Sequence, residues 1–384
     1  MASPIEELPT SVPPVSGVAT SIALFIGWSP QGPTDQGLRL KSFADYERDY
    51  GGLNPGSLLG YAIRQFFGNG GSVAYVLRIV SAAGDDVPIG PADTEFQTAL
   101  AALFNTGGPA DRIDLFNLIC VPGLVDAATV AIMQRHARER RAFLLLDCGQ
   151  TDTVATVIGS LAGKTGADAL NSALYFPWVE APDPLQANAL RAFPPCGFVA
   201  GVMARIDAAR GVWKAPAGTD AALNGVAGPA MTISDAEQGQ LNPHAVNCVR
   251  SFPGRGTVVF GARTLAGDDA GGSQWKFIPV RRTALFLGES VSRGTKWAVF
   301  EPNAEPLWAK LRLGVGDFMQ GLFRQGAFAG STPAQAFFVK CDATTTTQAD
   351  IDRGVVNIVL GFAPLKPAEF VILIIAQIAG GLSR

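Results

Sequence analysis

Charged residues are scarce in this sequence. Asp, Glu, Lys and Arg make up 16% of the 384 residues, whereas typical soluble domains have about 25%. Hydrophobic residues make up 48%, so a soluble monomer would have few charges with which to cover its apolar surface. Large subunit interfaces are the simplest explanation, and a deeply buried multilayer core is the alternative. The net charge of −3 argues against nucleic acid as a partner, because binding to phosphates needs a basic patch.

Histidine is nearly absent, and the sequence contains only His136 and His244. Neither has a cysteine or a carboxylate at the spacing of a metal site. No Gly-x-Ser-x-Gly elbow marks a nucleophilic serine, although spacing alone leaves a Ser/His/Asp arrangement open. We therefore predict no metal and no cofactor, and we assign no catalytic residue.

The cysteines do not form a disulfide pattern. There are five of them, which is an odd number, and they are widely spaced. Cys120 and Cys148 follow the apolar runs LFNLI and FLLLD and are predicted to be buried free thiols. The chain is therefore expected to fold in a reducing compartment.

Long hydrophobic runs are also absent. Residues 1–14 contain Glu6, Glu7 and several prolines, without the apolar segment of a signal peptide. The longest apolar run, residues 370–376, is far shorter than the ~18–20 residues that cross a bilayer. We expect a protein that is made in the cytoplasm and is not inserted into a membrane.

Apolar periodicity and turn residues predict a mixed α/β fold. Ser42 is a predicted helix N-cap, Asp45 follows three residues later, and Gly51 and Gly52 end that helix. Between about residues 100 and 230, strands alternate with helices, which predicts a mainly parallel sheet covered on both faces. The predicted helices span residues 42–50, 57–67, 126–140, 151–163, 196–210, 280–294 and 305–325. The predicted strands span residues 18–27, 72–80, 115–121, 142–148, 172–177, 246–250, 257–261, 336–341, 355–362 and 370–378.

Two features look like parts of enzyme sites. Residues 159–165, GSLAGKT, resemble a phosphate-binding loop, but only three residues separate the glycines and Ile158 stands where the motif needs glycine. The motif needs four residues there to wrap backbone amides around the phosphates, so a helix end at Gly163 is preferred. Asp147 ends an apolar strand, where α/β enzymes often place a catalytic carboxylate, although an aspartate that caps the next helix is commoner. An α/β enzyme dependent on Asp147 or Lys164 is kept as an alternative.

Both chain ends look incomplete as parts of a monomer. Residues 1–17 hold four prolines and are predicted to form an extended arm outside any core. Residues 368–378 form an apolar strand, with no charge after Glu369 until Arg384. On an exposed edge such a strand would aggregate unless it always paired with a neighbour. The pattern fits strand addition to another subunit and the last strand of its own sheet equally well.

Several segments carry a family resemblance. Residues 17–80 begin GVATSIALFIGWSPQGP and continue through SFADYERDYGG. In the C-terminal third, the matching segments are residues 241–265, 280–308, 323–342 and 361–372. The order and spacing of these segments, between residues 17 and 372, resemble those of the phage tail sheath family. The opening departs from the family, because many relatives begin with a tyrosine-rich segment that is replaced here by Ala2-Ser3-Pro4-Ile5. The N-terminal arm is therefore expected to be shorter or to fold differently.

The resemblance implies a fold and a domain plan. The sheath core is expected to combine N- and C-terminal parts, with a middle subtilisin-like α/β domain and extended terminal arms. The expected segments are an N-terminal linker arm at residues 1–22, the first part of the core at 23–100, the middle α/β domain at 101–234, the C-terminal sheath core at 235–365 and the C-terminal linker strand at 366–384.

The resemblance also implies a function. Sheath subunits polymerise helically around an inner tube and contract from a metastable extended state, which drives the tube through a target membrane. Energy stored at assembly makes a nucleotide site unnecessary. The implied partners are other copies of the chain, sheath paralogues, the inner tube protein, and baseplate and terminal cap proteins. Assembly in the bacterial cytoplasm would yield a phage tail, or a released or membrane-docked particle. A non-contractile baseplate or cap relative is the alternative.

The same resemblance assigns roles to particular residues. Arms of adjacent subunits are expected to pair as strands and to bend at prolines. The helix at residues 305–325 is expected to contact the inner tube, with a solvated charged face as the alternative. The predicted inter-subunit residues are Val15, Gly17, Val18, Thr20, Phe370, Val371, Leu373 and Ile375, the predicted hinges are Pro13, Pro14, Pro364 and Pro367, and the predicted tube contacts are Lys310 and Arg312.

Overall fold

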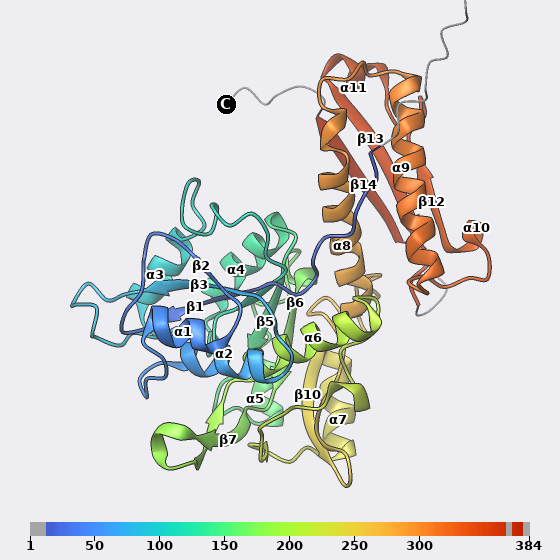
Figure 1. Ribbon diagram of the computed structural model, residues 1–384. Coiled ribbons are helices and arrows are strands. Elements are labelled where there is room, and N and C mark those ends of the chain that lie inside the picture. The colour runs from blue at the N-terminus through green and yellow to red at the C-terminus, as the bar shows by residue number, and fades with distance from the viewer. Residues whose placement is uncertain (1–12, 366–370, 379–384) are drawn as a thin grey trace, which may run out of the picture. The chain divides into compact units, whose positions relative to one another are not determined.

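The computed structural model describes residues 13–365 and 371–378 (Figure 1). The chain divides into two compact units. The first comprises Ala19–Leu285 and is called the central unit here. The second combines Met1–Val18 with Phe286–Arg384 and is called the terminal unit.

The described residues form strands and helices that match most of the expected elements. The strands are β1 Ala23–Trp28, β2 Leu38–Leu40, β3 Ala74–Ile79, β4 Leu118–Cys120, β5 Phe143–Asp147, β6 Ser172–Phe176, β7 Val179–Asp183, β8 Ala189–Phe193, β9 Gly228–Pro229, β10 Val246–Phe252, β11 Gly256–Phe260, β12 Phe337–Lys340, β13 Val355–Phe362 and β14 Val371–Ile378. The helices are α1 Phe43–Tyr50, α2 Leu58–Gly68, α3 Thr94–Ala102, α4 Ala127–Glu139, α5 Val154–Gly159, α6 Cys196–Arg210, α7 Asp235–Leu241, α8 Ile278–Gly294, α9 Glu305–Arg324, α10 Pro333–Ala336 and α11 Gln348–Asp352.

An eight-stranded sheet organises the central unit. Its strand order is β11-β10-β6-β5-β4-β1-β3-β2. The pairs from β10 through β6, β5, β4 and β1 to β3 are all parallel. Only the outer strands β11 and β2 pair antiparallel with their neighbours. The mainly parallel α/β sheet predicted from the sequence is therefore confirmed.

Both faces of this sheet are covered, because alternate residues of each strand point to opposite sides. In β1, Phe25 belongs to a buried cluster with side chains of α1, α2 and α6. The next residue, Ile26, belongs to a second cluster with side chains of α3, α4, α5 and α7. The sheet is thus the middle layer of three (Figure 1).

Local signals fixed several element ends correctly. Ser42 accepts a hydrogen bond from the backbone N–H of Asp45 at 3.2 Å, and the Asp45 carboxylate accepts one from the N–H of Ser42 at 3.1 Å. This reciprocal pair is a capping box. Gly51 ends the helix with a φ of 87°, a left-handed conformation that glycine adopts without steric cost. α6 and β13 also have the predicted bounds.

Other expectations were wrong in detail. The strand predicted for residues 18–27 begins only at Ala23, because the backbone N–H of Val18 donates instead to Ser290 of α8. The helix predicted for residues 151–163 ends at Gly159, because residues 160–164 continue as short turns. Helix α3 and the β7–β8 hairpin were not predicted. β7, β8 and β9 form a small antiparallel sheet beside the main one.

A buried ion pair joins distant parts of the central unit. Two guanidinium nitrogens of Arg282 donate to the Asp207 carboxylate at 2.6 and 2.9 Å. Arg282 also donates to the backbone oxygen of Thr20 at 2.9 Å. Both charged side chains are 3% exposed, so removing one would leave the other charge buried without compensation. The ion pair therefore ties α6 and α8 to the segment that enters β1.

The terminal unit is built around a three-stranded antiparallel sheet of order β12-β13-β14. Helix α9 packs against β12 and β13 (Figure 1). Its buried side chains include Leu307, Trp308, Leu311, Val315, Met319 and Leu322, which follow the helical spacing of an amphipathic helix.

The segment boundaries implied by the family resemblance stay a prediction, and the two compact units divide the chain at other places. Strands from residues 23–100 and from residues 235–365 share one sheet with the strands of residues 101–234. The division between the units falls instead at Val18/Ala19 and, within α8, at Leu285/Phe286.

Candidate subunit-interface segments

The carboxyl edge of the parallel sheet is the place where an α/β enzyme would bind its substrate. Asp147 lies there at the end of β5 and is fully buried. Its carboxylate accepts hydrogen bonds from the backbone N–H groups of Gly123 at 2.9 Å and Cys196 at 2.8 Å. Burial raises the pKa of Asp147 to about 6. Both carboxylate oxygens thus join the loop after β4 to the N-terminus of α6, which is a structural role.

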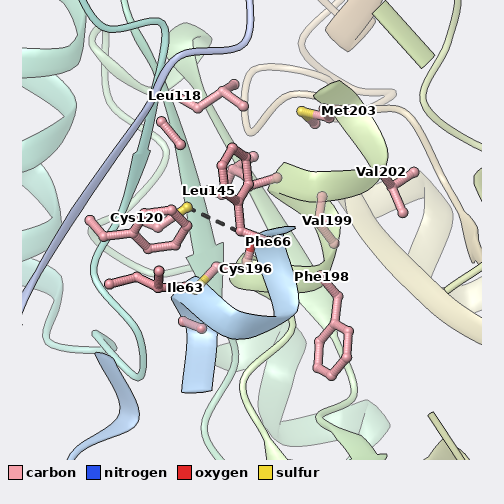
Figure 2. Close-up of a cluster of buried hydrophobic side chains, with 14 of the residues drawn as sticks. Ile63, Phe66, Leu118, Cys120, Leu145, Cys196, Phe198, Val199, Val202 and Met203 are labelled. Carbon is pink, nitrogen blue, oxygen red and sulfur yellow. Dashed lines mark hydrogen bonds between the residues drawn. The ribbon is translucent and has the colours of Figure 1, made fainter. Parts of the chain in front are cut away.

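The thiols near Asp147 belong to the core. Cys120 of β4 and Cys196 of α6 lie among Ile63, Phe66 and Leu145, and the Cys120 thiol donates to the Cys196 backbone oxygen at 3.8 Å (Figure 2). Burial raises the pKa of the Cys196 thiol well above its ordinary value. All five cysteines are free and buried, as predicted for Cys120 and Cys148, which is typical of structural, poorly reactive thiols.

The segment that resembled a phosphate-binding loop follows a helix. Residues 160–164 come directly after α5, whereas a phosphate loop joins a strand to a helix. Lys164 is 3% exposed, and burial lowers its pKa. Its carbonyl oxygen accepts from the Gln134 side-chain amide at 2.8 Å. A lysine buried in this way cannot present its charge to a phosphate.

Neither histidine lies in a cluster that suggests chemistry. His136 stacks on Phe104 with ring centroids 4.6 Å apart, and its Nδ1 is 3.1 Å from the Glu139 carboxylate. His244 lies 3.8 Å from Asp268 near the protein surface. Within residues 13–365 and 371–378, no group of three or more His, Cys, Asp or Glu residues could hold a metal ion. Within the same ranges, no helix is long and apolar enough to span a bilayer.

The predicted N-terminal arm is seated on α8 of its own chain. A methyl group at Gly294 would lie 2.8 Å from Val15, and one at Gly17 would lie 2.9 Å from the ring of Phe286. The Val18 N–H donates to Ser290 at 3.1 Å. Close approach at two glycines means that the backbone of this segment contacts the helix directly. Pro13 and Pro14 precede the contact and are exposed. Thr20 belongs to the central unit, where its backbone oxygen accepts a hydrogen bond from Arg282.

The predicted C-terminal strand pairs within the chain described here. β14 runs antiparallel to β13 over eight residues, from Val355 opposite Ile378 to Phe362 opposite Val371. Leu373 and Ile375 are therefore strand residues. Among the described residues, no strand pairs with the other edge of β14. Pro364 follows β13 and is buried, while Pro367 and Phe370 lie outside the described residues.

The two predicted tube contacts differ in their surroundings. Arg312 donates to the backbone oxygen of Cys341 and to the Glu305 carboxylate, and the hydrogen bond to Glu305 raises the pKa of Arg312 further. Lys310 lies two residues before Arg312 on α9 and is half-buried. It forms no ion pair with another described residue. The exposed face of α9 also carries Leu313, which is 55% exposed.

One exposed residue was missed by the sequence analysis. Phe300 has a φ of 73° and is 82% exposed. A left-handed backbone costs a residue with a side chain about 1–2 kcal/mol, and leaving a phenylalanine in water forgoes about 1.5–3 kcal/mol. No sequence signal marked this position.

Two family descriptions match adjacent parts of the chain. Residues 110–265 match the phage tail sheath protein central domain. Residues 271–378 match the phage tail sheath C-terminal domain.

Solved structures resemble nearly the whole chain. The helical sheath of the anti-feeding prophage in its contracted state has a TM-score of 0.75 and 30% identity, over 97% of each chain. The contracted sheath of the extracellular contractile injection system PVC also has a TM-score of 0.75 and 30% identity, over 97% of this chain and 96% of that chain. A prophage major tail sheath protein of Pseudomonas aeruginosa is 26% identical over 66% of this chain, which spans 62% of that relative's length. With 30% identity sustained over whole subunits, the chain belongs to the phage tail sheath family.

Proposed function

We propose that this chain is the sheath subunit of a contractile particle. It polymerises helically around an inner tube and contracts from a metastable extended state, driving the tube through a target membrane. The observation that carries this proposal is the whole-chain similarity to contracted sheaths, with a TM-score of 0.75 over 97% of the chain. A lattice with two arrangements of the same subunits needs no nucleotide, because the energy is stored when the extended form assembles.

The C-terminal strand supplies the connection between subunits in this proposal. β14 is an edge strand with an eight-residue pairing to β13. The pairing can be exchanged with little change in energy, because β14 of one copy can replace β14 of the next in the same register. An exchanged strand keeps two subunits joined while their bodies rotate. The proposed exchanged residues are Val371, Leu373 and Ile375, together with the preceding Phe370. We propose that the chain bends at Pro364 and Pro367 to carry this strand to the next subunit.

The N-terminal arm is the proposed second connection. Val15, Gly17 and Val18 contact α8 closely, which gives the arm a fixed point of departure. Pro13 and Pro14 are exposed immediately before that point and restrict the backbone there. We assign the hinge to these prolines, so that the residues before them reach an adjacent subunit.

The proposed contact with the inner tube is the exposed face of α9. Lys310 is the better of the two predicted contacts, because Arg312 is already paired with Glu305. A charge without an ion-pair partner in the described part of the chain is the one available to an acidic tube surface. We therefore expect Lys310 to contribute to tube binding and Arg312 to stabilise α9 against the end of β12.

Two chains of different length test the role of β14. A chain without residues 371–384 lacks the strand, and a chain without residues 379–384 keeps it and serves as the control. We expect the control to form tubes in negative-stain electron microscopy, and the shorter chain to remain as folded, unassembled subunits by sedimentation. Normal tubes from the chain without β14 would contradict the proposal.

Engineered cysteines test strand exchange itself. Val359 and Ile374 are register partners in the β13–β14 pair. Tubes assembled from a mixture of V359C chains and I374C chains should yield disulfide-linked dimers after oxidation. The double variant V359C/I374C is the positive control for reactivity of the pair. If the double variant forms its disulfide only within one chain and the mixture stays monomeric, strands are not exchanged.

A subunit placed at an end of the particle is the second candidate. The chain is also similar to a chain in the anti-feeding prophage baseplate structure, with a TM-score of 0.72 and 30% identity. Counting subunits along isolated particles separates the two roles, because a sheath subunit recurs along the whole tail and a baseplate or cap subunit occurs only at an end.

The remaining partners and location follow from the same proposal. They are other copies of the chain, sheath paralogues, an inner tube protein, and baseplate and cap proteins, with assembly in a bacterial cytoplasm before release or membrane docking. We propose no nucleic-acid partner, no membrane insertion and no enzymatic activity. The structural role of Asp147 supports the last point.

A further inference from the structure

Phe300 combines two unfavourable features in one residue. Its backbone is left-handed, with a φ of 73°, a conformation that is rare for bulky side chains. Phe300 is 82% exposed, whereas Leu190, which follows it among the large apolar residues whose burial the structure describes, is 58% exposed. Glycine or asparagine would fit this backbone at lower cost. Strain of this kind persists where a specific function requires it.

The turn that presents Phe300 is held on both sides. The turn around Phe300 is closed by the Glu301 N–H, which donates to the oxygen of the buried Ala298 at 3.2 Å. After it, the Asn303 side chain donates to the Val355 oxygen at 3.0 Å and accepts from the indole N–H of Trp308 at 2.8 Å. The backbone that carries the ring is therefore held in place before binding, which lowers the cost of ordering it at an interface.

From this geometry we propose that Phe300 is an anchor that inserts between apolar side chains of a second copy of this chain in the assembled helix. The inference rests on the proposed function, because a helical polymer places other copies against every subunit. Exposed aromatic anchors that enter a neighbour's hollow dominate the energy of protein interfaces. When a residue on one face of a subunit contacts a different face of the next copy, the interface is heterologous. Repeated heterologous interfaces that do not close into a ring build open helices.

Charge favours a second copy over the inner tube as the partner. Glu301 follows Phe300 directly and is exposed. The proposed tube contact depends on the cation Lys310, which would meet an acidic surface. The Glu301 carboxylate beside Phe300 would be repelled by that same surface. The surface that accepts Phe300 is thus distinct from the surface that accepts Lys310.

Two substitutions separate the ring from the backbone strain. F300G removes the ring and relieves the strain, so the subunit should keep or raise its melting temperature. F300A removes the ring and keeps the strain. We expect both variants to raise the concentration needed for tube formation at least tenfold, measured by sedimentation of the purified chain. L190A, which truncates another exposed apolar side chain, is the matched control and should change that concentration less than twofold.

A photoreactive benzoylphenylalanine at position 300 identifies the partner. A crosslink between two copies of the chain supports the proposal, and a crosslink to the inner tube protein alone overturns it. Normal assembly of F300G, with wild-type tubes present under the same conditions, overturns the proposal and leaves the sheath function intact. If the wild-type chain forms no tubes either alone or with its inner tube, the sheath function fails and this inference fails with it.

Discussion

The pH dependence of stability tests whether Asp147 is a structural link at the sheet edge. Burial raises its pKa from 3.8 to about 6. Between these pH values the folded chain holds the proton and the unfolded chain has lost it. Raising the pH through this window therefore favours unfolding. The two pKa values correspond to about 3 kcal/mol of unfolding free energy, at about 1.4 kcal/mol for each pH unit.

The substitution D147N removes this titration and keeps the shape of the side chain. Asparagine has one accepting oxygen, so one of the N–H groups of Gly123 and Cys196 loses its acceptor. That loss costs about 1–3 kcal/mol at every pH. On top of this constant offset, the unfolding free energy of the variant should rise by about 3 kcal/mol relative to wild type as the pH increases from about 3.5 to 7.5. The slope of the difference curve, not its offset, carries the prediction.

Urea unfolding followed by circular dichroism at a series of pH values measures the difference curve. The protein should be dilute enough to remain unassembled. D126N is the control of opposite sign, because hydrogen bonds from Thr129 lower the pKa of Asp126. The Asp126 carboxylate stabilises the fold above pH 3.8 and loses that effect as the pH falls through its lowered pKa. D126N should therefore lose stability relative to wild type as the pH rises. A flat D147N curve, or one with the sign of D126N, would refute the reasoning.

Three further predictions concern local links in each unit. S42A removes the capping box of α1 and should cost about 1 kcal/mol in urea unfolding, whereas S42D should keep most of it; equal losses in both variants would show that the cap does not matter. R282A leaves the buried Asp207 charge unpaired and should lower the free energy of unfolding by about 3–5 kcal/mol. The double variant R282M/D207L should restore most of this loss, and its failure to do so would point to the hydrogen bond between Arg282 and Thr20 instead. G294A places a methyl group 2.8 Å from Val15 and should speed cleavage of residues 15–18 by proteinase K; a cleavage rate equal to wild type would argue against the contact with α8. In the control G316A the methyl group enters open space, so this variant should add up to about 1 kcal/mol of helix stability.

Local structure was largely predictable because its causes lie within a few residues. Ser42 and Asp45 form their capping box across three residues, and the glycine that ends α1 is the next residue after the helix. The alternation of apolar strands with amphipathic helices identified the parallel sheet before its strand order was known. Composition and the apolar C-terminal segment suggested subunit interfaces, but each left an explanation within one chain open. The family resemblance then supplied the assembly role.

The tertiary structure decided what depends on distant contacts. Phe300 takes its left-handed backbone in a turn held by Asn303, whose side chain reaches Val355, 52 residues away. Arg312 looked like a free cation in the sequence, but the fold pairs it with Glu305 and Cys341. The boundary of the units also depends on strand order, since β10 pairs with β6 and so joins the predicted C-terminal core to the middle domain. Sequence determines such features only through the whole fold, because each needs two segments brought together by packing.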